Sequence, residues 1–216
     1  PLGLTMSKRT SRKEIDELRP NEMTRFAVSP GAGLLRPAAQ RPSPNQDERP
    51  GGAEPELVII HGISLPPGEF GGPYIEALFT NGLDPEAHAY FREIDGLRVS
   101  SHLLIRRDGD VVQFVPLGRR AWHAGDSQFR GRSTCNDFSI GIELEGTDDD
   151  AYTDAQYATL APVLDAIITA YPKIDARRIA GHCDVSPGRK TDPGPAFDWL
   201  RMYDELHEQM RNSENS

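Results

Sequence analysis

Apolar residues gather in short runs, each bounded by glycine, proline or a polar turn. Residues 57–61 form a continuous apolar run that ends in His61. This pattern predicts a buried strand whose last side chain reaches the rim of a sheet. Two further strands are expected over 99–106 and 111–115, because the Asp108-Gly109 pair between them is typical of a hairpin turn.

A fourth strand is expected over residues 138–144, where apolar side chains alternate with polar or small ones. The alternation assigns four apolar side chains to one face: Phe138, Ile140, Ile142 and Leu144. It assigns the other face to Ser139, Gly141, Glu143 and Glu145.

Helical spacing predicts the remaining elements. Thr153 and Gln156 form a capping box, and apolar residues then recur at helical spacing up to residue 171. Pro162 is expected to kink this helix, and Pro172 to end it. Two more helices are expected, over 74–80 and 199–211. Because strands and helices interleave, we expect an α/β (α+β) domain with a mixed central sheet flanked by helices.

The chain divides into four parts by composition. Residues 1–26 are expected to be a flexible extension with a short helix over 12–18, and residues 27–55 an irregular lead-in, since ten of its 29 residues are Pro or Gly. Residues 56–212 form the single predicted domain, and 213–216 a tail. Pro1–Thr5 precede the first methionine, Met6, and one interpretation is that they are an addition to the natural chain.

Composition excludes several classes of protein. The formal net charge of −9 over 216 residues argues against a nucleic-acid binder, which needs a positive surface. No apolar run approaches the ~20 residues of a membrane span, and no secretory signal is evident. Two cysteines do not make a disulfide-dense scaffold. The missing signal favours a cytoplasmic protein, and our expectation for its oligomeric state is a monomer.

Two histidines and one aspartate are candidates for a metal site. His61 ends the first strand, and His182 and Asp192 lie in a loop rich in Gly and Pro that bends between them. Two imidazole nitrogens, one carboxylate oxygen and an open position make the pattern of catalytic zinc. The alternative interpretation is a hydrogen-bonded core histidine, a surface histidine and an Asp-Pro turn.

Charged residues near these positions add candidates for catalysis. Glu143 or Glu145 could serve as a general base, or both could simply face solvent on an edge strand. Lys190 could stabilise the charge of an oxyanion, or could be an exposed lysine on a loop. Trp122 could wall a groove for a sugar or a peptide, or could be a core residue with its N–H satisfied.

Seven segments together resemble the zinc-dependent N-acetylmuramoyl-L-alanine amidases, most closely the cytoplasmic branch that acts on 1,6-anhydro-muropeptides. The segments are HGISLPPGEFGGP (61–73), LRVSSHLLIRRDG (97–109), RAWHAG (120–125), CNDFSIGIELEGTD (135–148), YTDAQY (152–157), GHCD (181–184) and RKTDPG (189–194). The resemblance runs from about residue 42 to residue 204 and leaves out residues 1–26.

The resemblance implies a fold similar to peptidoglycan recognition proteins and the amidase-type phage lysozyme. It implies one Zn²⁺ per chain, held by His61, His182 and Asp192, with Glu143 rather than Glu145 as the base and Lys190 stabilising the transition state. The bond cleaved would join muramic acid to L-alanine in an anhydro-muropeptide. Histidines at positions 102 and 123 would line the pocket. We assign Arg98, Trp122 and His123 as candidates for binding the substrate, Arg98 through a carboxylate of the stem peptide.

One residue departs from the family pattern, because Gly62 stands where an asparagine usually follows the first histidine. Three alternatives remain open. The first is a cell-envelope amidase acting on intact peptidoglycan, and the second is a non-catalytic peptidoglycan-binding module. The third is a cysteine amidase that uses Cys135 or Cys183 as its nucleophile.

Overall fold

The computed structural model describes residues 25–215, so the expected helix over 12–18 lies outside the described residues. A six-stranded mixed sheet forms its centre, in the order β12-β5-β11-β6-β7-β3. These strands are β3 (Ala39–Gln40), β5 (Leu57–Ile63), β6 (Leu103–Ile105), β7 (Val111–Gln113), β11 (Ser139–Glu145) and β12 (Ile179–Gly181). Strands β12, β5, β11 and β6 run parallel, and β7 is antiparallel to β6. The predicted mixed sheet is confirmed.

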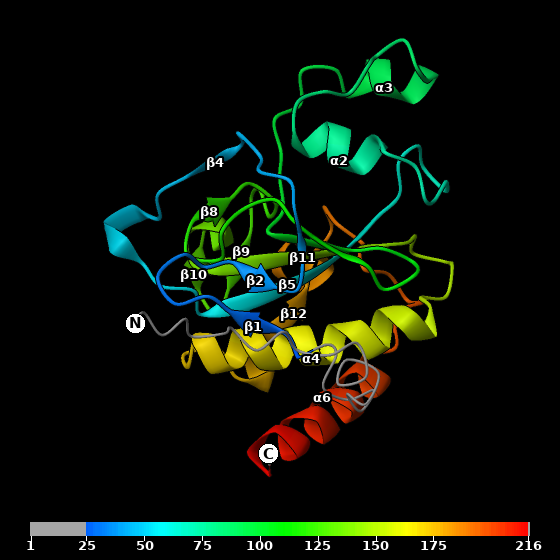
Figure 1. Ribbon diagram of the computed structural model, residues 1–216. Helices are drawn as coiled ribbons and strands as arrows, with labels where there is room; N and C mark the ends of the chain where they lie inside the picture. Colours follow the sequence, from blue (N-terminus) through cyan, green and yellow to red (C-terminus); the bar gives the residue numbers. More distant parts are fainter. Residues whose placement is uncertain (1–24, 216) are drawn as a thin grey trace, which may run out of the picture.

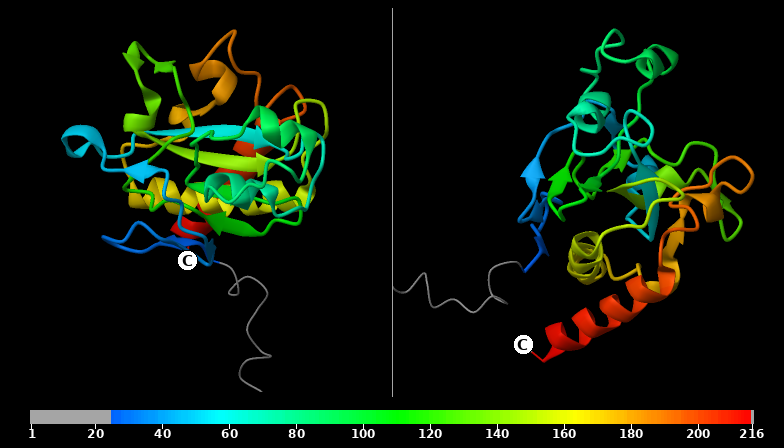
Figure 2. Two further views of the ribbon diagram at one scale, coloured as in Figure 1. Left: turned by 90° about the horizontal axis from the view of Figure 1, so that it is seen from above. Right: turned by 90° about the vertical axis from the view of Figure 1, so that its right-hand side faces the viewer.

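Helices lie on both sides of this sheet (Figures 1 and 2). Helix α4 (Asp154–Ala170) runs along one face, with α6 (Trp199–Glu214) packed beyond it. Helices α2 (Tyr74–Phe79) and α3 (Ala89–Glu93) stand on the opposite side from α4 and α6. Within residues 25–215 no helix is long and apolar enough to cross a membrane.

The smaller elements connect these layers. They are β1 (Ala27–Val28), β2 (Leu35–Arg36), β4 (Gln46–Asp47), η1 (Pro50–Gly52), β8 (Arg120–Ala121), β9 (Gln128–Phe129), β10 (Arg132–Ser133), η2 (Cys135–Asp137), η3 (Ala176–Arg178) and α5 (His182–Val185).

Helix α4 begins at the predicted capping box, in which Thr153 and Gln156 each bond the other's backbone. It runs as one element through Pro162, where we expected a kink. Leu160 and Val163, on either side of the proline, are fully buried in the main core, and this packing holds both halves of the helix against the sheet. The helix ends at Ala170, as Pro172 predicts.

The main core fills the space between the sheet and α4, and the alternation in β11 points Ile140, Ile142 and Leu144 into it. Phe138 instead packs with Leu57 and Ile59, which was not predicted. It ends the η2 turn with non-extended backbone angles, so the alternation of β11 has not yet begun there.

The face of β11 opposite the main core is covered as well, since the His123 ring lies against Gly141 there, and β11 is a central strand between β5 and β6 rather than an edge strand. Glu143 and Glu145 are therefore buried, at 7% and 1% exposure. This excludes the interpretation that they face solvent on an edge strand.

The lead-in over 27–55 contains short strands, contrary to the irregular structure that we expected. Strand β3 extends the central sheet beside β7. The backbone N–H groups of Arg41 and Ser43 then donate to the carbonyls of Gln113 and Phe114, each at 2.9 Å. Pro42 falls between these two donors, so its missing N–H removes none of the bonds.

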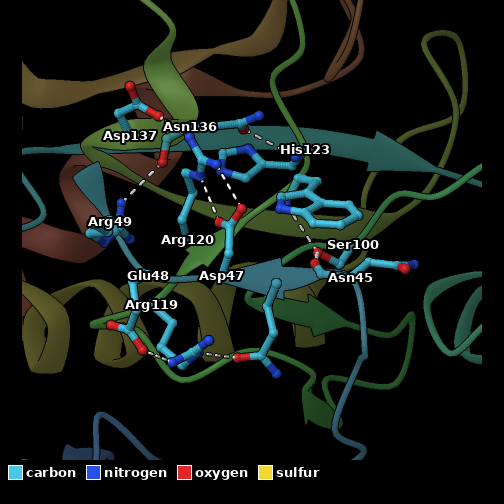
Figure 3. Close-up of polar contacts among 12 residues, drawn as sticks. Asn45, Asp47, Glu48, Arg49, Ser100, Arg119, Arg120, His123, Asn136 and Asp137 are labelled. Carbon is cyan, nitrogen blue, oxygen red and sulfur yellow. Dashed lines mark hydrogen bonds and ion pairs between the residues drawn. The ribbon is translucent and has the colours of Figure 1, made fainter.

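Arg49 anchors the end of the lead-in in the domain (Figure 3). It is only 4% exposed. Its guanidinium donates to four carbonyl oxygens at 2.9–3.1 Å, those of Leu117, Gly118, Asn136 and Ser139. Nearby, Arg120 binds Asp47 through two nitrogens and Asp137 through the third, at 2.6–2.7 Å.

Replacing Arg49 should therefore destabilise the domain, although Arg49 precedes its first long strand. We expect Arg49→Met to lower the free energy of unfolding by about 3 kcal/mol, because buried carbonyls lose their donors. Urea unfolding would measure this. Arg41→Met is the matched control, since Arg41 is an exposed arginine paired with Glu76, and it should cost less than about 1 kcal/mol. Equal effects of the two substitutions would contradict the anchoring role.

Candidate metal centre

The three predicted metal ligands come from neighbouring parts of one sheet edge. His61 lies near the carboxyl end of β5, and His182 directly follows β12, the parallel neighbour of β5. Parallel strands bring their carboxyl ends to the same edge. The loop after α5 then returns Asp192 to this edge, where the Cys183 N–H donates to the Asp192 carbonyl at 2.9 Å.

Side-chain atoms of these residues converge on one point. His61 Nδ1 and His182 Nδ1 are 3.0 Å apart, and Asp192 Oδ2 lies 3.2 Å and 3.0 Å from them. One ligand atom from each residue lies within 4.8 Å of the others, an arrangement that could hold a metal ion. Both histidines are almost completely buried, at 2% and 3% exposure.

The carbonyl of Ala124 fixes the tautomer of His182. His182 Nε2 lies 3.1 Å from this oxygen. A carbonyl oxygen can only accept, so Nε2 carries the proton. In a neutral imidazole the Nδ1 atom then presents its lone pair to the convergence point.

His61 is oriented by a second histidine. His61 Nε2 lies 2.9 Å from His123 Nδ1, and His123 Nε2 lies 3.3 Å from Ser139 Oγ. With protons on the Nε2 atoms of both rings, each ring donates to the next group and His61 Nδ1 keeps its lone pair. His123 thus supports His61 in the way that partners of metal-binding histidines do.

The protonation states favour a cation at the convergence point. Burial, above all, lowers the pKa of His61 to about 4, so this ring is neutral near pH 7. Burial raises the pKa of Asp192, but the close His182 and His61 imidazoles lower it by more, so the net pKa is below the ordinary value and Asp192 is a carboxylate. Two nitrogen lone pairs and a carboxylate facing each other form a donor set that suits a divalent metal.

Glu143 lies beside this cluster, because the β5–β11 register places it directly opposite His61. Its Oε2 atom is buried, and no residue in 25–215 offers it a hydrogen bond. Burial, followed by the negative charge of Asp192, raises the pKa of Glu143 well above its ordinary value, while the charge of Lys190 acts in the opposite direction. A carboxylate of this kind is typical of a general acid or base.

Glu145, two residues along, has its carboxylate fully engaged. It accepts from the backbone N–H of Gly71 at 2.6 Å and of Arg107 at 3.3 Å. The Arg106 guanidinium lies 3.7 Å away. Glu145 therefore fastens the loop that follows β5, and Glu143 is the carboxylate with an unpartnered oxygen.

The other predicted site residues differ in their surroundings. Lys190 is exposed, yet its charge acts on both His61 and Glu143. Trp122 is half-buried, and its side chain helps to lower the pKa of Asp47, after the larger effect of the Arg120 hydrogen bond. Arg98 is exposed, and no hydrogen bond in the described part of the chain joins it to the cluster.

His102 does not line an open pocket, as the resemblance implied, because it is completely buried. Its Nδ1 accepts from Gly141 N at 2.9 Å, and its Nε2 lies 3.0 Å from Arg119 O. Burial, above all, lowers its pKa to about 3. His102 therefore holds β11 in place as a neutral imidazole.

Two supporting residues were not found by sequence reasoning. The Asn136 side chain accepts from the N–H groups of His123 and Ala124, which holds the loop that contacts His61 and His182 (Figure 3). Arg189 donates to the carbonyls of Ala124 and Asp126 from the other side. Both bind backbone carbonyl or N–H groups, a function that leaves no pattern in a single sequence.

Comparison with known proteins decides the family. Residues 51–195 match the family described as N-acetylmuramoyl-L-alanine amidase. The chain belongs to this family. The amidase is 63% identical over 170 residues to the 1,6-anhydro-N-acetylmuramyl-L-alanine amidase AmpD of Escherichia coli, covering 79% of this chain and 92% of the relative.

Solved structures agree with this assignment. The crystal structure of a selenomethionine AmpD derivative superposes with a TM-score of 0.79 at 60% identity, covering 81% of this chain and 97% of the other. The Escherichia coli amidase AmiD, in complex with anhydro-N-acetylmuramic acid-L-Ala-D-γ-Glu-L-Lys, superposes with a TM-score of 0.51 at 26% identity, covering 84% and 65%. The family resemblance and the fold inferred from the sequence are both confirmed.

Glu143 should lower the stability of the metal-free amidase. The raised pKa means that the Glu143 carboxyl stays protonated to a higher pH in the folded protein than in the unfolded chain. Folding therefore becomes less favourable as pH rises above the unfolded pKa of about 4.3. In chelator-treated protein at pH 8, we expect Glu143→Gln to raise the thermal midpoint by about 2–4 °C. The difference in thermal midpoint between Glu143→Gln and the parent protein should shrink as pH falls toward about 4.3. A variant less stable than its parent at pH 8 would contradict the destabilising effect of Glu143.

Proposed function

We propose that this amidase hydrolyses the amide bond between 1,6-anhydro-N-acetylmuramic acid and L-alanine in muropeptides, using one zinc ion. The convergence of three ligand atoms beside the unpartnered carboxylate of Glu143 carries the proposal. The name of the AmpD relative and the substrate in the AmiD complex support this bond as the target.

His61, His182 and Asp192 would hold the zinc ion. Two nitrogens and one carboxylate oxygen leave a coordination position open, as in catalytic rather than structural zinc sites. A zinc ion held there would supply Lewis acidity, which would polarise the scissile carbonyl and make water more acidic. The Ala124 carbonyl and His123 keep the two imidazoles turned so that each presents a lone pair.

Glu143 would serve as the general base and then as the general acid. Its unpartnered Oε2 accepts a proton from the attacking water, and the same carboxyl delivers that proton to the nitrogen of the departing L-alanine. Burial and the charge of Asp192 raise the pKa of Glu143, which makes its carboxylate a stronger base than an ordinary glutamate toward the proton of water.

Lys190 would stabilise the negative charge that develops on the carbonyl oxygen. Its ammonium acts electrostatically on both His61 and Glu143. A fixed positive charge at this place favours the transition state over the neutral amide.

The substrate would be recognised outside the metal cluster. Arg98 is exposed and is our candidate to bind a carboxylate of the stem peptide. Trp122, half-buried, offers a surface for the sugar or peptide, while His123 acts mainly by supporting His61. Similarity to the 1,6-anhydro enzyme supports a role in muropeptide recycling in the cytoplasm.

Mass spectrometry of an anhydro-muropeptide incubated with the purified protein tests the activity. We expect free stem peptide, lost when a chelator removes the metal and restored by zinc. Intact peptidoglycan is the comparison substrate, since faster release from it would favour a cell-envelope amidase instead. Zinc-loaded protein that cleaves neither substrate would favour a binding module. Loss of activity on thiol alkylation, with resistance to the chelator, would favour the cysteine mechanism.

Two substitutions separate metal binding from proton transfer. We expect Glu143→Ala to keep one zinc per chain and to lose activity by about 10²–10⁴-fold, since the base is gone while the ligands remain. We expect Asp192→Ala to lose zinc as well as activity. Metal analysis beside the hydrolysis rate checks both. Near-normal turnover by Glu143→Ala, or stoichiometric zinc in Asp192→Ala, would overturn the corresponding assignment.

A further inference from the structure

The side chain of Tyr152 crosses the sheet edge that carries the metal ligands. Tyr152 precedes α4 and is only 5% exposed. Its hydroxyl donates to the carbonyl of Pro193 at 2.9 Å, in buried surroundings. Pro193 directly follows the proposed ligand Asp192, so this bond holds the backbone next to a metal-facing carboxylate.

Two glycines make room for the tyrosine. Gly62 follows His61 on β5, and Gly146 follows the end of β11. A Cβ atom on Gly146 would lie 2.5 Å from the Tyr152 ring. A Cβ atom on Gly62 would overlap the Tyr152 hydroxyl oxygen, whereas its next neighbours, both atoms of Pro193, would be at 3.5 Å and 3.7 Å.

Gly62 is therefore required for space and not for backbone conformation. It is not among the glycines with positive φ, so other residues could adopt its backbone angles. In this chain, any side chain at position 62 would need the Tyr152 hydroxyl to move from where it is placed. The lack of a side chain at position 62 and the buried hydroxyl are therefore in direct steric contact in this chain.

The Asp192 turn is held from both directions. The Cys183 N–H donates to the Asp192 carbonyl at 2.9 Å, and the Gly194 N–H donates to the Thr191 carbonyl at 3.0 Å. The Tyr152 hydroxyl supplies the bond to the next carbonyl along the chain, that of Pro193. Loss of this bond would free the segment on which the Asp192 carboxylate depends.

We propose that Tyr152 is a positioning residue for the metal ligand Asp192, and that Gly62 is the partner that admits its hydroxyl. The inference rests on the proposed zinc site. Outer partners of metal ligands typically change metal affinity by about 10–100-fold when they are removed. Tyr152 acts here through the peptide backbone rather than through a bond to the ligand side chain.

Zinc affinity, measured by competition with a chelating dye, tests this directly in the full chain. We expect Tyr152→Phe to weaken zinc binding about tenfold, because the ring stays and only the donor is lost. Tyr157→Phe is the matched control, since this second buried tyrosine bonds Asp198 N, away from the ligands. It should change the affinity by less than about twofold.

Gly62→Ala gives a second test, because its effect on zinc affinity should depend on whether the Tyr152 hydroxyl is present. Alone it should weaken zinc binding by a similar factor, because the new methyl group displaces the hydroxyl. In the Tyr152→Phe background it should add less than about a further twofold, since the remaining neighbours are at ordinary contact distances. Effects that simply multiply would overturn the pairing of the two residues.

A spectroscopic measurement distinguishes positioning from general loss of stability. In the cobalt-substituted protein, Tyr152→Phe should change the visible absorption of the metal, and Tyr157→Phe should not. Unchanged zinc affinity and unchanged cobalt absorption in Tyr152→Phe would overturn this inference alone. A parent protein that binds no zinc would instead overturn the proposed function.

Discussion

The parallel pairing of β5 with β11 is the constraint on which the site depends. Its register sets His61 beside Glu143, so one potential metal ligand and one unpartnered carboxylate share a single rung of the sheet. The parallel pairing of β12 with β5 brings His182 to the same edge. A shift of one residue in either pairing would turn a functional side chain toward the main core.

Buried polar groups around this rung have hydrogen-bond partners, and the donor and acceptor roles of these partners allow one tautomer for each imidazole. The Ala124 carbonyl can only accept from His182, and the run from His61 through His123 to Ser139 orients the other imidazole. Glu143 is the exception, with an unpartnered oxygen in a place where burial disfavours its charge. Such a group lowers stability in the absence of ligand and is retained where chemistry requires it.

Sequence reasoning found the long strands, the two long helices and the residues that converge. The strands and helices repeat a local pattern, such as alternation in β11 or the capping box of α4, whereas the site residues were open candidates until the family resemblance was considered. It did not find β3, because two residues take their strand conformation from β7, far along the chain. Nor could it find Asn136, which binds backbone N–H groups, or the packing of the Tyr152 hydroxyl into the space beside Gly62. Both contacts depend on the folded geometry and not on a pattern of residue types.

The lead-in bears on how the chain folds during its synthesis. β3 and Arg49 leave the ribosome early, but the last carbonyl that Arg49 binds belongs to Ser139, 90 residues later. At about 5–20 residues per second, this interval is about 5–18 s. The Arg49 guanidinium, which is buried in the folded domain, therefore stays hydrated until β11 has been synthesised. Contacts between such distant residues slow folding, so the nascent domain closes around this arginine late, when β11 enters the sheet.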